Sequence, residues 1–198
     1  MALSAALEKF KESLSCVTGN GAQHTHIQIE EHDPLAALRK ITLLAPMGDW
    51  VSFNPDDGRK CRRLDRKSNL VLMSPLLVRD DKHDHHCACD AVIVLNQGRE
   101  LRILYIELKS GNPRGYAKQF ISTRNFVRYA INLLNEFQQE NFSIKEERYV
   151  VFCGGKKQLL NKKPTVSKLN KIRNTSTNNA YIRQVPDAAN LHLKELLA

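Results

Sequence analysis

The spacing of hydrophobic positions changes along the chain and predicts both helices and strands. Residues 3–17 and residues 116–137 carry apolar side chains at three- and four-residue intervals, which is typical of amphipathic helices. Residues 91–95 and 101–108 are short apolar runs rich in Val, Ile and Leu, which favour strands. The polar, glycine-containing segment between these two runs is typical of a hairpin turn. The pattern therefore predicts an α/β protein built around a hairpin.

The rest of the chain predicts further elements around this hairpin. Pro34 opens a second predicted helix at residues 35–44, because proline is tolerated at a first helical position. Breaker residues predict a loop at 46–68, and residues 69–78 predict a strand at the edge or end of the sheet, because Pro75 interrupts it. The other predicted elements are a buried strand beside the hairpin at 148–153, a last strand at 180–185 and a closing helix at 188–197.

The length of 198 residues predicts a single domain, without internal repeats or a clear boundary. Hydrophobic residues make up 42% of the chain and charged residues 26%, which is ordinary for a globular protein. The expected core covers about residues 69–155, preceded by N-terminal helices and followed by a basic C-terminal segment. In the long helix, the expected apolar stripe consists of Phe120, Val127, Ile131 and Leu134, widened by Ala130 and Phe137.

Two carboxylates and a lysine mark the outer end of the hairpin. Asp90 precedes the first apolar run, whereas Glu107 and Lys109 lie at the end of the second. If the turn is centred on residues 98–99, Asp90 lies opposite Glu107. If the turn is centred one residue earlier, Asp90 lies opposite Tyr105 and diagonal to Glu107. In either register the three charged side chains share one face, because side chains alternate along a strand with a period of two.

This arrangement allows a catalytic and a purely structural interpretation. Two carboxylates this close repel each other unless a cation lies between them or one is protonated. A hard divalent cation takes such oxygen ligands, and Lys109 stands beside the pair, where a lysine can orient a water molecule or hold a phosphate. The structural alternative is a half-buried hairpin whose polar end carries an ordinary Glu–Lys ion pair.

Asp90, followed by a hairpin and the triplet Glu107-Leu108-Lys109, resembles the PD-(D/E)xK nuclease superfamily. The resemblance implies a restriction-endonuclease-like core, with a mixed β-sheet flanked by helices. It also implies that Asp90, Glu107 and the backbone carbonyl of Leu108 bind Mg²⁺, for which Mn²⁺ can substitute. Lys109 would position the attacking water during phosphodiester hydrolysis. Cys89 stands where the family often has proline.

The resemblance implies further site residues on the helices. Gln119, near the start of the long helix, corresponds to a polar residue that some family members place beside the site; the structural alternative is a solvent-exposed residue. The family often adds an upstream acid from an N-terminal helix, and Glu8 is favoured for this fourth metal position over Glu12, Glu30 and Glu31. Similar acid-x-Lys triplets at 65–67 and 80–82 have no apolar strand leading into them.

The charge of the chain predicts a polyanionic partner. The formal net charge is +9 and the isoelectric point is about 9.4, which favours nucleic acid first and an acidic membrane surface second. Basic residues crowd positions 59–67, and positions 154–174 carry seven Lys and Arg without one acid. Both stretches suit phosphate contact, although solvated loops have the same composition. The residues expected to contact nucleic acid are Lys118, Arg124, Lys156, Lys157, Lys162 and Lys163.

The cysteines and histidines support a second kind of site. Five scattered cysteines suit a reducing cytoplasm, and no signal peptide or bilayer-spanning apolar run is recognisable. The stretch from His83 to Cys89 contains three histidines and two cysteines, which raises the alternative of a zinc knot. Against zinc, strand alternation places Cys87 and Cys89 on the face opposite Asp90, as small core residues.

Three hypotheses follow from the sequence. The leading hypothesis is a Mg²⁺-dependent nuclease, with DNA favoured over RNA and an endonuclease favoured over an exonuclease. The second is a non-catalytic nucleic-acid-binding protein that shares the fold and the basic surface. The third is an adaptor stabilised by zinc. No separate recognition domain is visible, so target specificity would require loops, a homodimer or a partner subunit.

Overall fold

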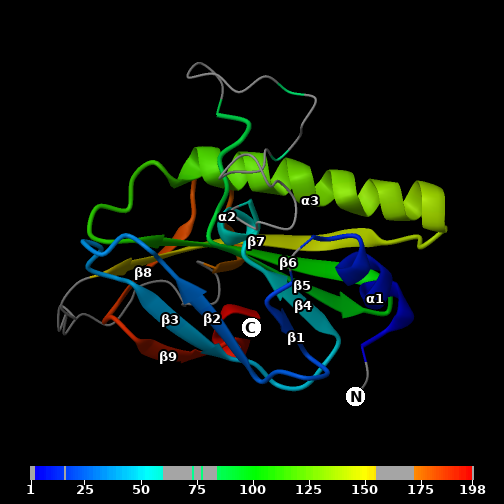
Figure 1. Cartoon of the computed structure of the whole chain (residues 1–198), viewed down its shortest axis with the longest axis horizontal. Helices are drawn as coiled ribbons and strands as arrows, with labels where there is room; N and C mark the ends of the chain where they lie inside the picture. The colour runs from blue at the N-terminus through cyan, green and yellow to red at the C-terminus, as the bar shows by residue number, and fades with distance from the viewer. Residues whose placement is uncertain are drawn as a thin grey trace.

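The computed structural model describes residues 3–15, 17–59, 73, 77, 84–154 and 172–197, and the predicted hairpin lies at its centre (Figure 1). Strands β5 (Ala91–Gln97) and β6 (Glu100–Lys109) pair antiparallel, with Gln97 opposite Glu100. Gly98 and Arg99 form the turn between them, and both have positive φ angles, of 65° and 77°. Two central residues with positive φ are typical of a type I′ turn, which fixes the register of a hairpin. The first of the two registers considered from the sequence is therefore the one adopted.

The hairpin is the middle of a six-stranded mixed sheet in the order β1-β4-β5-β6-β7-β8. Strand β4 (Trp50–Phe53) pairs antiparallel with β5 and is flanked by the short β1 (Gly19–Asn20). On the other side, β7 (Ser143–Gly154) runs parallel to β6, and β8 (Tyr181–Val185) runs parallel to β7. Helix α3 (Tyr116–Gln138) connects β6 to β7, because parallel neighbours need a long crossover.

Helices and a second sheet cover opposite faces of this sheet, in three layers (Figure 1). Helices α1 (Ala5–Glu12) and α3 pack on one face. A three-stranded sheet packs on the other face, in the order β2 (His26–Glu30), β3 (Lys40–Leu44) and β9 (Ala189–His192). Short helices α2 (Pro55–Arg59) and α5 (Lys194–Leu197) follow β4 and β9. The expectation of a mixed sheet flanked by helices is confirmed.

The second sheet was not predicted, and its strands replace elements expected to be helical. Residues 40–44 form β3 rather than part of a helix, because Ile41 and Leu43 are buried whereas Thr42 and Leu44 are only partly buried, a period of two. The predicted closing helix at 188–197 is divided into strand β9 and helix α5. Strand β3 lies between β2 and β9, so tertiary pairing decides its conformation.

Two other predicted boundaries are wrong. The first helix covers residues 5–12 instead of 3–17; it begins after Ser4, whose hydroxyl accepts a hydrogen bond from the Leu7 amide. The expected loop at 46–68 contains strand β4 and helix α2 in its described part. The predicted strand at 69–78 lies outside the described residues except for positions 73 and 77.

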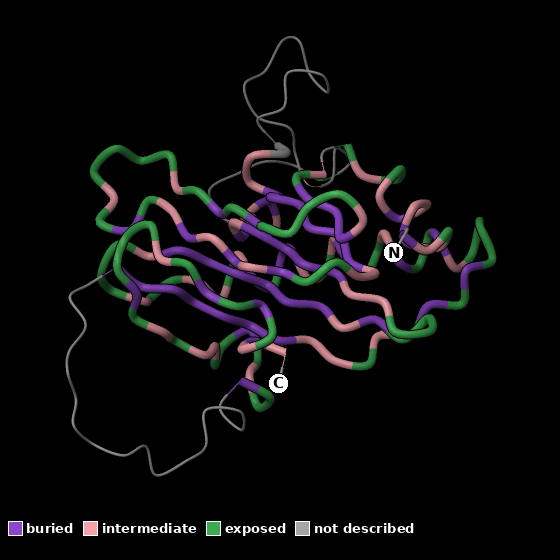
Figure 2. Tube along the Cα trace, turned by 90° about the horizontal axis from the view of Figure 1, so that it is seen from below, coloured by how far each residue is buried: buried purple, intermediate pink, exposed green. Residues whose placement is uncertain are grey.

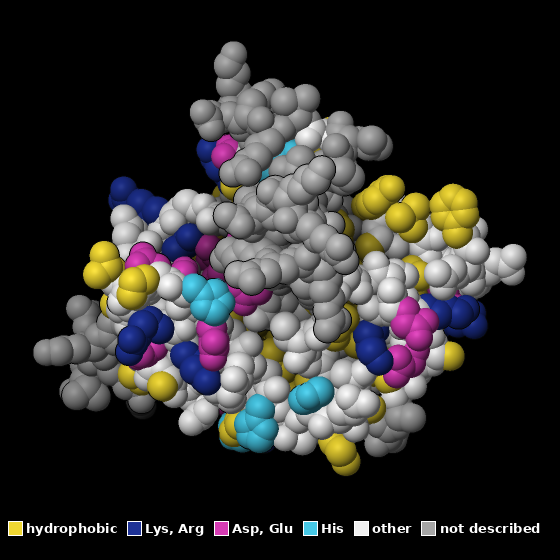
Figure 3. All heavy atoms as spheres, viewed as in Figure 1, with side chains coloured by type: hydrophobic (Ala, Val, Ile, Leu, Met, Phe, Trp, Pro, Cys, Tyr) yellow, Lys and Arg dark blue, Asp and Glu magenta, His cyan; other side chains and the backbone are white. Residues whose placement is uncertain are grey.

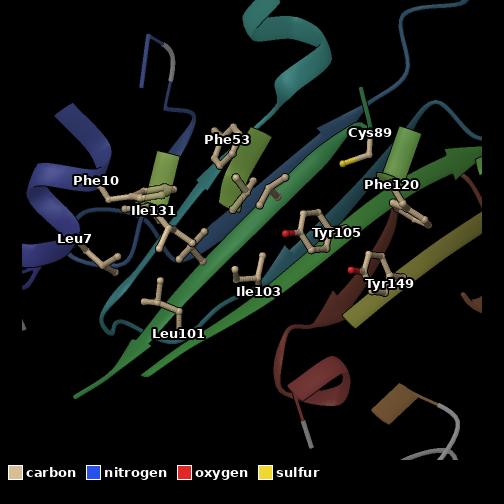
Figure 4. Packing of buried hydrophobic residues seen from close by; sticks show 14 of the residues in the cluster. Leu7, Phe10, Phe53, Cys89, Leu101, Ile103, Tyr105, Phe120, Ile131 and Tyr149 are labelled. Atoms are coloured by element: carbon tan, nitrogen blue, oxygen red, sulfur yellow. The ribbon is translucent and has the colours of Figure 1, made fainter. Parts of the chain in front are cut away.

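The core under α3 follows the predicted stripe except at its end. Phe120, Val127, Ile131 and Leu134 are buried and Ala130 is partly buried, but Phe137, in the last turn of the helix, is 81% exposed. Phe120 packs against Tyr149, which stacks on Tyr105 at a ring-centroid distance of 5.0 Å (Figure 4). Most residues of the central strands are buried (Figure 2). This aromatic cluster holds α3 over the strand that carries Glu107.

We expect Phe120→Ala to lower the free energy of unfolding by about 3–5 kcal/mol, because a fully buried ring leaves a cavity. Phe137→Ala, on the same helix, is the matched control and should change it by less than about 0.5 kcal/mol. Urea denaturation of both variants measures the difference. Equal effects would contradict the packing of α3 on the sheet.

Candidate functional site

The open end of the hairpin brings Asp90 and Glu107 together. Ala91 pairs with Ile106, so extending this register by one residue places Asp90 opposite Glu107. The backbone amide of Leu108 donates a hydrogen bond of 2.6 Å to Asp90 Oδ2. This bond holds the Asp90 carboxylate against the end of β6.

Glu107 is a buried carboxylate with one oxygen left unsatisfied. Its side chain is only 5% exposed, and Oε1 accepts a hydrogen bond of 2.7 Å from Lys109 Nζ. Its other oxygen, Oε2, is buried and has no hydrogen-bond partner among the described residues. A buried polar atom without a partner is costly, so its presence beside a second carboxylate indicates a position for a ligand.

Burial raises the pKa values of both carboxyl groups. Burial raises the pKa of Glu107 from 4.5 to about 7, although the Lys109 ammonium acts in the opposite direction. Burial also raises the pKa of Asp90 well above its ordinary value, and the Glu107 carboxylate raises it further. Protons or a cation would relieve this repulsion, and a cation does so most at a pH where both groups are ionised.

Two further carboxylates act on this pair electrostatically. Glu31, directly after β2, raises the pKa of Asp90, and Asp56, in the first turn of α2, raises the pKa of Glu107. Glu31 is one of the alternatives considered from the sequence, whereas the predicted loop at 46–68 gives Asp56 no role in the site. The signal that identifies Asp56 is its position three residues after Phe53, the residue of β4 that pairs with Val92 near the start of β5.

The structure does not bring Glu8 to the carboxylate pair. Glu8 forms an ion pair of 2.8 Å with Lys11 on the same helix. The N-cap of this helix, Ser4, donates its amide to Asp49 and accepts a hydrogen bond from Asn96, near the turn of the hairpin. The N-terminus of helix α1 therefore lies at the end of β5 opposite to Asp90.

Helix α3 carries Gln119, Lys118 and Arg124 on or near the face of the sheet that bears Glu107. Gln119 is half-buried, and its side-chain oxygen has no hydrogen-bond partner among the described residues. Lys118 is exposed and forms an ion pair of 2.6 Å with Asp84. Arg124 is half-buried beside Tyr149, whose pKa burial raises to about 12 although the Arg124 charge acts in the opposite direction. The four other lysines expected to contact nucleic acid, Lys156, Lys157, Lys162 and Lys163, lie outside the described residues.

The cysteines are placed differently from the prediction. Cys89 is fully buried, as expected, but it packs with Val92 and Tyr105 on the helix-covered face, not on the opposite one. Its backbone amide donates to Thr123 Oγ1 on α3 at 3.0 Å. Alternation does not extend to Cys89 because this residue precedes β5. Burial and the Glu107 carboxylate raise the pKa of its thiol well above the ordinary value.

The fit of a metal ion can be judged from these donors. Among residues 84–154 and the other described ranges, no group of three or more His, Cys, Asp or Glu side chains is arranged to hold a metal ion, and His83 lies outside those ranges. Asp90 and Glu107 form a pair. A pair suits Mg²⁺, which commonly takes one or two carboxylates and completes its shell with water and substrate phosphate oxygens. The unsatisfied Glu107 Oε2 is consistent with this cation, and the Leu108 carbonyl remains a predicted third ligand.

Comparison of the chain with protein-family models, with curated proteins and with solved structures finds no match in any of the three. Any functional assignment therefore depends on the geometry of the site. Within the described ranges, no helix combines the length and the apolar character needed to cross a membrane.

Lys109 lowers the pKa of Glu107, so we expect Lys109→Met to raise that pKa above about 7. The pH titration of the Glu107 carboxyl carbon by NMR measures this change. Lys118→Met is the matched control and should leave the titration unchanged, because Lys118 is exposed and paired with Asp84. An unchanged Glu107 titration in Lys109→Met would show that the ion pair has no electrostatic role.

Proposed function

We propose that this protein is a metal-dependent nuclease that hydrolyses phosphodiester bonds, with DNA as the favoured substrate and endonucleolytic cleavage as the favoured mode. The observation that carries the proposal is the pairing of the partly buried Asp90 with the buried Glu107, with Glu107 Oε2 unsatisfied and Lys109 at hydrogen-bond distance from Glu107. Paired carboxylates beside a lysine supply what metal-assisted phosphodiester hydrolysis requires.

Each residue of the site has a separate role in this proposal. Asp90 and Glu107 would hold Mg²⁺ or Mn²⁺, which when bound polarises the scissile phosphate and makes water easier to deprotonate. The Leu108 amide keeps Asp90 in place. Lys109, only 22% exposed, orients the attacking water or binds a phosphate oxygen. Gln119, in the first turns of α3, would supply its amide oxygen, which has no hydrogen-bond partner among the described residues.

The arrangement of elements supports a restriction-endonuclease-like core as part of this proposal. A long helix, α3, follows the strand that ends in Glu107-Leu108-Lys109, as the resemblance to PD-(D/E)xK nucleases implies. Strand β7 then returns parallel to β6 and places Cys153 beside Lys109. The carboxylates thus lie at the end of a mixed sheet, where a substrate can approach.

The distribution of charge supports nucleic acid as the partner. Of the thirty Lys and Arg residues, thirteen lie outside the described residues, mostly within the basic stretches 59–67 and 154–174. The described residues that lead into these stretches are α2, whose Asp56 acts on Glu107, and Gly154, beside Ser110. Both belong to the end of the sheet that carries the carboxylate pair. Basic residues joined to this end favour binding of a phosphate backbone.

Incubation of the purified protein with circular DNA, linear DNA and RNA, in Mg²⁺, Mn²⁺ and EDTA, tests the proposal. We expect cation-dependent cleavage of circular DNA, reduced on the order of a hundredfold in Lys109→Ala. The control variant Lys145→Ala changes an exposed lysine that pairs with Glu100 near the hairpin turn, and it should cleave normally. Salt-sensitive binding of DNA without cleavage would favour the non-catalytic binding protein instead.

A further inference from the structure

A polar pocket of about 420 Å³ lies between the second sheet and the segments that flank β4. One wall consists of side chains from β2, namely His26, Gln28 and Glu30. The rest of the lining consists of Thr18, His24, Asn54 and Asp57. Figure 3 shows the face that carries β2 and β3, on which histidine side chains lie close to acidic and basic side chains. The volume lies within the range usual for small-molecule and nucleotide sites.

The alternation of β2 produces the β2 wall. Ile27 and Ile29 point into the core between the sheets, so His26, Gln28 and Glu30 are exposed on the other side. In the rest of the lining, Asn54 is only 7% exposed, and its side-chain oxygen accepts a hydrogen bond of 3.3 Å from the Thr18 hydroxyl. A hydrogen bond therefore fixes the Asn54 amide, whereas the polar side chains of β2 are accessible to solvent.

Two acidic residues of the pocket are neighbours in sequence of the two acids that act electrostatically on the candidate active site. Glu30 precedes Glu31, which acts on Asp90, and Asp57 follows Asp56, which acts on Glu107. His32 connects the two sides of the pocket at this end, because its Nε2 lies 3.0 Å from Asp57 Oδ1. The segments that carry the pocket walls therefore lead directly to the residues that act on the carboxylate pair.

The chemistry of the walls selects the base over the phosphate. Glu30 and Asp57 repel a phosphate, even though Lys40 lies 3.1 Å from Glu30 and His32 pairs with Asp57. A carboxylate has about four lone-pair positions, so the ion pair with Lys40 does not exhaust the capacity of Glu30 to accept hydrogen bonds. Carboxylates accept from the amino group of cytosine, and Asn and Gln side chains pair with adenine, whereas thymine and uracil present no exocyclic amino group.

We propose that this pocket is a base-recognition subsite, which holds a nucleobase next to the scissile phosphate and prefers bases with an exocyclic amino group. Gln28, Glu30, Asn54 and Asp57 are its specificity-determining residues. The inference rests on the proposed function for the position of the strand, but it concerns binding and can be tested without cleavage.

Binding of single-stranded oligo-deoxycytidine and oligo-deoxyuridine of equal length tests the subsite, because the two bases differ in the group at C4. Fluorescence anisotropy in EDTA and constant salt gives both dissociation constants. We expect the wild-type protein to bind oligo-deoxycytidine about fivefold more tightly or better. The ratio should fall towards unity in Glu30→Gln and Gln28→Ala. The control variant Asn190→Ala changes an exposed residue of β9 in the same sheet and should keep the ratio.

The outcomes separate the subsite from the nuclease activity. Equal affinities in the wild-type protein would overturn the subsite, and so would a preference that both pocket variants retain. Cleavage of DNA in Mg²⁺ together with equal affinities would support the nuclease activity and refute only the subsite. A base preference lost in the pocket variants, in a protein that cleaves nothing, would support the subsite and refute the nuclease.

Discussion

Glu107→Gln is expected to reduce Mg²⁺-dependent cleavage of DNA on the order of a thousandfold or more. The substitution keeps the size of a buried side chain and removes only its charge. It therefore removes one of the two proposed cation ligands and the ion pair with Lys109, whose Nζ lies 2.7 Å from Glu107 Oε1. Initial rates of nicking of closed circular DNA measure the loss.

Glu8→Gln is the matched control for this variant. The same chemical change is made on α1, where Glu8 is paired with Lys11 beside the turn end of the hairpin. We expect it to cleave at the wild-type rate. A large loss in Glu8→Gln, or full activity in Glu107→Gln, would show that the carboxylate pair at the open end of the hairpin is not the catalytic centre.

The second large effect concerns stability and pH in the metal-free protein. The pKa of Glu107 is about 7 in the folded protein against 4.5 as its ordinary value, so the folded state holds a proton that the unfolded state has lost between these pH values. The free energy of unfolding should therefore fall as pH rises from about 4.5 to about 7, by on the order of 3 kcal/mol. The raised pKa of Asp90 acts in the same direction.

Urea denaturation in EDTA across this pH range measures how the free energy of unfolding depends on pH. Glu107→Gln should remove most of this dependence. Addition of Mn²⁺ should reverse the loss of stability at higher pH, because a cation binds the ionised carboxylates. Below pH 7 each unit of pH should weaken cation binding up to about tenfold, since one proton must leave Glu107. A free energy of unfolding that rises with pH in this range, measured without metal, would contradict the raised pKa values of Asp90 and Glu107.

The predictable part of the fold is the part with a strong local pattern. Both strands of the hairpin, helix α3 and the two parallel strands have continuous apolar runs or a long stripe, and the structure forms each of them. The sequence of strand β3 has no local pattern that decides its conformation. Its residues Ile41 and Leu43 suit either a helix or a strand, and pairing with β2 and β9 makes them a strand. Contacts between distant segments cannot be derived from local spacing.

The candidate site also has one part that the local sequence predicts and one part that depends on tertiary packing. The alternation of β6 and the even-length turn place Asp90, Glu107 and Lys109 together, and these depend only on residues within one hairpin. The influence of Glu31 and Asp56 depends on how the second sheet and α2 pack on that hairpin, which no local pattern records. Glu8 lies on helix α1, whose N-cap Ser4 bonds to Asn96 near the turn of the hairpin, and no local pattern records that placement.

Direct binding of Mn²⁺ tests the central claim, that Asp90 and Glu107 share a divalent cation. Electron paramagnetic resonance of free Mn²⁺, titrated with protein slightly above pH 7, gives the number of ions bound. We predict saturable binding by the wild-type protein, displacement by Mg²⁺, and loss of binding in both Asp90→Asn and Glu107→Gln. Binding that is undiminished in both variants, or absent from the wild-type protein in the presence of DNA, would contradict the claim.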